Sequence, residues 1–113
     1  MSLRFFCVDY CEGKRVEEPM LWPNGKEGIL HSMDCVLHTP KNFCGIVNAN
    51  NQTLQFIVES DRTVTIDVPV IENGSYVGSY CGNSTLKECL ALVSELGENA
   101  DFTKLPRLTF VQC

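Results

Sequence analysis

Apolar and polar residues alternate through the middle of the chain, over residues 53–81. The alternating apolar positions are Leu54, Phe56, Val58, Val64, Ile66, Val68 and Val70. Because side chains of a strand point to opposite faces in turn, this period of two predicts strands with one apolar face. The connections at 60–62 and 73–74 have hairpin length, and Asn73-Gly74 is the pair favoured for a tight turn. We therefore predict a β-meander of three antiparallel strands.

A different spacing follows the meander and indicates an amphipathic helix over about residues 84–96. Its apolar stripe, at helical spacing, is Leu86, Cys89, Leu90, Val93 and Leu96. Asn83 or Ser84 is suited to cap the helix, Thr85 and Glu88 have the spacing of a capping box, and Gly97 ends it. We expect this helix to cover the apolar face of the meander.

The remaining segments predict further strands around the same sheet. Aromatic and branched residues favour strands at 4–10, 16–21, 43–47 and 108–112. Trp22-Pro23-Asn24-Gly25 is a turn sequence, and Trp22 either anchors this turn to the core or stacks on a ligand. Residues 29–38 fit a short helix or a strand, and Pro69 indicates a bulge or the end of one strand pairing. The predicted fold is a single α+β domain over residues 1–113, a mostly antiparallel sheet with one main helix on one face.

Charge narrows the classes of partner. The 113 residues carry a net charge of −5, and no run of Lys or Arg is long enough to follow a phosphate backbone. The sequence therefore argues against nucleic acid and is better suited to a basic protein surface, although modest negative charge also serves solubility alone. The absence of a signal-like segment and of a long apolar run predicts a cytoplasmic protein that does not enter a membrane. The seven cysteines are an odd number, and we expect most to be reduced thiols used as small apolar residues.

Cys81 is the first candidate for catalysis. It is expected between the last meander strand and the helix, where the positive end of the helix dipole would favour the thiolate. A thiol nucleophile needs a base, and the chain offers His31 and His38. The alternative interpretation is a small buried residue that closes the strand.

A metal site is the second candidate, at His31, Asp34, Cys35 and His38. Imidazole, carboxylate and thiolate all bind zinc, and a helix would bring these side chains roughly onto one side. Their spacing matches no standard zinc signature, so the default interpretation is exposed histidines and a packed cysteine. We expect no cofactor.

The third candidate is the polar face of the meander, formed by Gln55, Ile57, Glu59, Thr63, Thr65 and Asp67. Such a face is either simply solvated or a surface for a protein partner or for a second copy in a homo-oligomer. The chain lacks a phosphate-binding glycine loop, a dinucleotide fingerprint and a serine-nucleophile motif. We therefore predict a non-catalytic binding module, by analogy of size and charge with accessory proteins such as immunity partners of bacterial toxins. A thiol-dependent enzyme or redox protein centred on Cys81 is the alternative.

Overall fold

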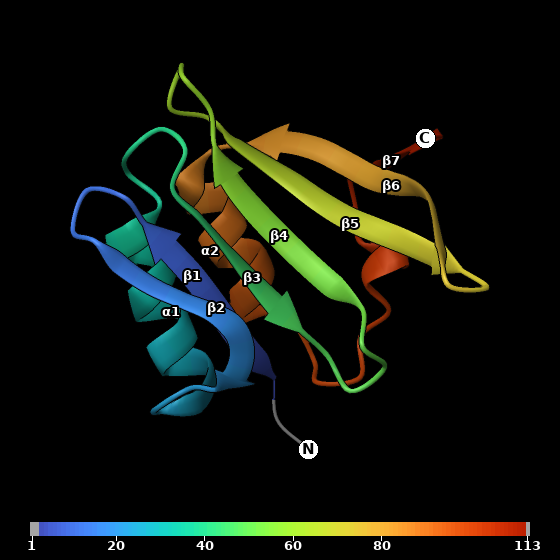
Figure 1. Ribbon diagram of the computed structural model, residues 1–113, viewed down its shortest axis with the longest axis horizontal. Helices are drawn as coiled ribbons and strands as arrows, with labels where there is room; N and C mark the ends of the chain where they lie inside the picture. The colour runs from blue at the N-terminus through green and yellow to red at the C-terminus, as the bar shows by residue number, and fades with distance from the viewer. Residues whose placement is uncertain (1–2, 113) are drawn as a thin grey trace.

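The computed structural model describes residues 3–112, which form one antiparallel sheet of seven strands (Figure 1). The strands are β1 (Arg4–Asp9), β2 (Lys14–Leu21), β3 (Phe43–Val47), β4 (Thr53–Val58), β5 (Val64–Glu72), β6 (Ser75–Ser84) and β7 (Thr109–Gln112). Their order across the sheet is β2-β1-β3-β4-β5-β6-β7. Only the position of β1 departs from sequence order: β1 lies between β2, which forms the edge of the sheet, and β3. The predicted meander is confirmed as β4, β5 and β6, and the sheet extends well beyond it.

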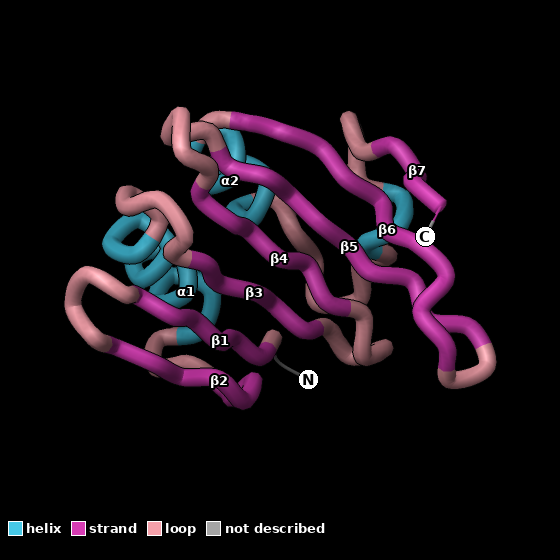
Figure 2. Tube along the Cα trace, turned by 45° about the horizontal axis from the view of Figure 1, so that its top comes forward, coloured by secondary structure: helices cyan, strands magenta, loops and turns pink. Residues whose placement is uncertain are grey.

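Two helices, α1 (Gly25–Val36) and α2 (Leu86–Ser94), lie side by side on one face of this sheet. Both lie behind the sheet in Figure 1, and the 45° turn in Figure 2 keeps them on that side. A short 3-10 helix, η1 (Phe102–Lys104), follows α2 and buries Phe102. The predicted α+β class is confirmed, with α1 as a second helix.

The core fills the layer between the sheet and the helices. The apolar residues of the meander that the alternation singled out are buried there, except Val70, which is half-buried. From the helices, Ile29, Met33 and Val93 are completely buried against them. Burying an apolar side chain of this size contributes about 1.5–3 kcal/mol. Hydrophobic burial therefore fixes both helices to the same face.

Turn chemistry sets the connections as predicted. Asn73 and Gly74 have φ values of 52° and 80°, the left-handed conformations of a primed hairpin turn. Trp22 anchors its turn to the core, because its ring meets the Phe5 ring at 4.7 Å and its Nε1 donates to Ser32 Oγ at 2.8 Å. Pairing with β4 ends at Asp67, two residues before Pro69, so the missing amide proton of Pro69 breaks no bond on that side.

Two predicted boundaries are wrong. Of the two alternatives for residues 29–38, the short helix is confirmed and the strand is wrong, but α1 begins earlier, at Gly25 directly after the Trp22 turn, and ends at Val36. The cap of α2 is Thr85, with the Thr85–Glu88 capping box formed, whereas β6 continues through Asn83 to Ser84. Because the cap is Thr85, the residues before it are free to extend the strand. At its other end, α2 stops at Ser94.

Candidate functional site

The face of the sheet opposite the helices, here called the open face, faces the viewer in Figure 1. Strand register places two rows of side chains across this face. One row runs through Phe6, Gly45, Gln55, Asp67 and Cys81, and the other through Val8, Phe43, Ile57, Thr65 and Asn83. The rows cross β1, β3, β4, β5 and β6, so the open face presents residues from five strands on one rigid support.

The structure brings the six predicted surface residues together. Gln55, Ile57, Thr65 and Asp67 occupy these two rows, and Glu59 and Thr63 flank the turn between β4 and β5. The four residues in the rows are half-buried, which is the exposure expected of a surface that can still make contacts. The sequence alternation predicted this grouping correctly.

Hydrogen bonds connect the polar side chains of the open face. Thr65 Oγ1 donates to Glu59 Oε2 at 2.5 Å, and Thr63 Oγ1 donates to Asp61 Oδ1 at 2.6 Å. Asn83 Nδ2 donates to Thr63 Oγ1 at 2.8 Å. These bonds hold the side chains in defined positions, so little rotamer freedom remains to be lost when a partner binds.

The turn between β4 and β5 makes this end of the open face acidic. Hydrogen bonds from the side chain and then the backbone of Thr63 lower the pKa of Asp61, so its carboxylate stays charged at neutral pH. Glu59 lies beside it in the same turn, with Arg62 as the nearest basic residue in sequence. Two carboxylates and one guanidinium leave the turn with a net negative charge.

An apolar centre, formed by Phe6, Phe43 and Ile57, lies next to the polar side chains. All three are half-buried. Phe43 and Ile57 are directly paired across β3 and β4, and the Phe6 ring lies over Gly45, where a Cβ atom would collide with it. Sequence reasoning missed Phe6 and Phe43. The pair Phe5-Phe6 contained a signal for Phe6 alone, because consecutive residues of a strand point to opposite faces.

Cys81 does not lie at a strand-to-helix turn, as the sequence predicted, but inside β6. Its Sγ donates to Asp67 Oδ1 at 3.3 Å. Burial, and then the hydrogen bond and negative charge of Asp67, raise the pKa of this thiol. His31 and His38 belong to the α1 segment on the other side of the sheet, so the structure does not bring a histidine to Cys81.

The predicted metal ligands form two separate pairs along α1 and the turn after it. His31 Nε2 lies 3.8 Å from Cys35 Sγ, and His38 Nε2 lies 3.7 Å from Asp34 Oδ1. Within residues 3–112, no group of three or more His, Cys, Asp or Glu side chains has the geometry to hold a metal ion. The spacing along one helix therefore produces pairs and not a common site.

Three other cysteines, Cys7, Cys44 and Cys89, are completely buried in the core as free thiols. Burial raises the pKa of all three, that of Cys89 to about 12. Buried thiols that resist ionisation are poor nucleophiles and poor metal ligands. These three serve as small apolar residues, as predicted for most cysteines, but Cys11 and Cys35 are exposed and Cys81 is half-buried, so among the six described cysteines the prediction holds for only half.

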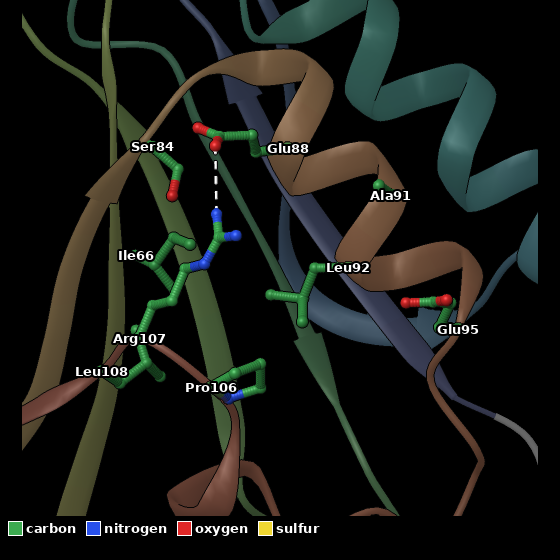
Figure 3. Close-up of a pocket in the computed structure, with 9 residues that line it drawn as sticks. All are labelled: Ile66, Ser84, Glu88, Ala91, Leu92, Glu95, Pro106, Arg107 and Leu108. Atoms are coloured by element: carbon green, nitrogen blue, oxygen red, sulfur yellow. Dashed lines mark hydrogen bonds and ion pairs between the residues drawn. The ribbon is translucent and has the colours of Figure 1, made fainter.

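A groove of about 380 Å³ lies on the helix side, between α2 and the segment that leads into β7 (Figure 3). Its lining is Ile66, Ser84, Glu88, Ala91, Leu92, Glu95, Pro106, Arg107 and Leu108. Arg107 reaches across it, with Nη1 at 3.1 Å from Glu88 Oε2. Glu88 also closes the capping box of α2, so the pair joins the chain before β7 to the helix. The groove contains neither histidine nor cysteine and has the chemistry of a packing seam.

Comparisons with family models, with curated proteins and with solved structures found no match for this chain. In the part of the chain that the structure describes, neither helix combines the length and the apolar character required to cross a bilayer. The functional argument therefore rests on the geometry of the open face.

Proposed function

We propose that this chain is a non-catalytic binding module that engages a basic surface of a protein partner through its open face. One observation carries the proposal: the open face combines a half-buried apolar centre at Phe6, Phe43 and Ile57 with fixed acidic and polar side chains beside it. Protein interfaces have this composition, an apolar core with a polar rim.

The energetics favour association at such a surface. Binding energy concentrates in a few side chains that become fully desolvated at the centre of an interface, which is the place of Ile57 and Phe43. The net charge of −5 attracts a basic partner and excludes acidic ones. Small acidic proteins that neutralise bacterial toxins bind their partners by this chemistry, and the analogy extends to size and charge only.

A charge-reversal capture experiment tests this surface. The double variant Glu59→Lys/Asp67→Lys changes the net charge from −5 to −1, since each substitution adds two. The control Glu12→Lys/Glu95→Lys makes the same change away from the open face, in the β1–β2 turn and at the C-terminal end of α2. Each tagged protein is used to capture partners from lysate of the source cells at two salt concentrations.

A protein captured by the wild type and by the control, but at least roughly tenfold less by the open-face variant, supports the proposal. Its capture should also weaken as salt increases. Thermal unfolding of each variant checks that the fold is retained. Equal capture by both double variants would mean that the open face is not the binding surface.

The alternative, a thiol-dependent enzyme centred on Cys81, has less support. Burial and Asp67 raise the pKa of the thiol, which lowers the fraction of nucleophilic thiolate at neutral pH. The sheet also lies between Cys81 and the helix that carries His31.

A further inference from the structure

The two edges of the sheet differ in how they are protected against pairing. The β2 edge carries four charged residues and a proline, Lys14, Arg15, Glu17, Glu18 and Pro19. Charges and proline on an edge strand discourage another strand from adding to it. The β7 edge has the sequence Thr-Phe-Val-Gln, with no charge and no proline, and all four residues are exposed. Only the β7 edge is therefore chemically open to a further strand.

Apolar side chains project from both faces of β7. Phe110 is 43% exposed and Val111 is 56% exposed. Phe110 contacts Tyr80 of β6, with ring centroids 5.1 Å apart, and Gly78 makes room for it because a Cβ atom there would meet the Phe110 ring. Phe110 is thus held in place on the helix side while a large part of its ring remains in water.

We propose that β7 pairs antiparallel with β7 of a second copy of this chain, about a two-fold axis at Phe110. Two sheets of seven strands then form one continuous sheet of fourteen. The contact leaves the open face free, so it goes beyond the proposed function and does not depend on it. A second copy is the occupant because β7 carries no charge, which removes the repulsion that two chains of net charge −5 would meet at most other places on their surfaces.

The register of the proposed β7–β7 pairing follows from the face of the sheet on which each side chain lies. In an antiparallel pair, directly opposite residues share a face, so a perpendicular two-fold axis must pass through one residue position. With the axis at Phe110, this residue lies opposite its own copy, on the same face as Tyr80. Val111 then lies opposite Thr109 of the second copy on the other face. The Tyr80–Phe110 contact is extended into a row of four rings, and aromatic cross-strand pairs stabilise sheets.

The size of the contact sets its strength. Four residues from each chain bury less area than the roughly 1,200 Å² of a stable interface. We therefore expect a weak dimer whose fraction increases with protein concentration.

Sedimentation velocity over a concentration series, combined with amide hydrogen exchange, tests the dimer. The wild type should sediment increasingly as a dimer, and β7 amides should exchange more slowly at high concentration while β2 amides do not change. Val111→Lys places a charge on the edge and should weaken the dimer by roughly tenfold or more. The matched control Met20→Lys, on the β2 edge at a residue 48% exposed, should leave it unchanged.

Several outcomes would overturn the proposal. These are a monomer at every concentration, a dimer without protection of β7 amides, and a dimer weakened by Glu59→Lys/Asp67→Lys but not by Val111→Lys. If Val111→Lys fails to fold, the exchange measurement on the wild type still decides. Phe110→Lys, whose side chain lies on the helix side with Tyr80, should also weaken the dimer, and its partner capture should equal that of the wild type, which separates failure of the dimer from failure of the open face.

Discussion

At Cys81, burial and then the neighbouring carboxylate of Asp67 make the thiol harder to ionise, and both raise its pKa. Asp67 accepts the hydrogen bond of the thiol at 3.3 Å, and its negative charge opposes formation of a second negative charge on sulfur. The same two residues lie in the central row of the open face. The reactivity of the Cys81 thiol therefore reports on the open face in the free protein.

Replacing Asp67 with Asn should lower the pKa of Cys81, because it removes the negative charge beside the sulfur. The thiolate fraction below that pKa then increases, and alkylation by iodoacetamide at a fixed pH becomes faster. Mass spectrometry of the Cys81 peptide measures the rate, with exposed Cys11 in the same sample as the internal reference. An unchanged ratio of the two rates would show that Asp67 does not control this thiol.

The start of α1 depends on a close approach of backbone atoms that only glycine permits. A Cβ atom at Gly28 would collide with the backbone carbonyl of Pro23, in the turn that Trp22 anchors. This approach connects the turn directly to the helix.

Gly28→Ala should therefore destabilise the protein by about 1–3 kcal/mol, because backbone atoms must move to accept the methyl group. The control is Gly97→Ala, after α2, where a Cβ atom would have no neighbour within 4 Å. That change should stay within about 1 kcal/mol of the wild type. Urea unfolding measures both, and equal stability of the two variants would contradict the account of the turn.

Elements defined by local alternation or local capping could be predicted from the sequence. The meander, the β5–β6 turn and the capping box of α2 depend on residues close together in the chain. The boundaries of α1 could not be predicted, because two glycines weaken its helical pattern and only the Pro23 contact shows why one of them is needed. The Thr85–Glu88 spacing did contain the signal that Thr85, and not Ser84, is the cap.

The residues of the open face, too, could be predicted only in part. The alternation in β4 and β5 correctly placed Gln55, Thr65 and Asp67 on the face opposite the core. Phe6 and Phe43 join them only through the pairing of β1 with β3 and of β3 with β4, which no single strand reveals. The displaced position of Cys81 followed from the misplaced start of the helix.

The whole molecule is a two-layer structure with helices on one side of the sheet (Figure 2). This arrangement leaves the open face and the β7 edge as two separate surfaces. The open face has an apolar centre and acidic side chains, which suit a basic protein, whereas the β7 edge is uncharged and suits a copy of itself. One chain could therefore bind its partner as part of a dimer.

Hydroxyl-radical footprinting of the captured complex tests the binding surface most directly, since it reports the exposure of individual side chains. If the partner binds at the open face, oxidation of Phe6, Phe43 and Ile57 should decrease in the complex. Oxidation of Leu30 and Leu90, which line the cleft between the two helices, should stay as in the free protein. Protection of the two leucines, with the three open-face residues oxidised as before, would contradict the account.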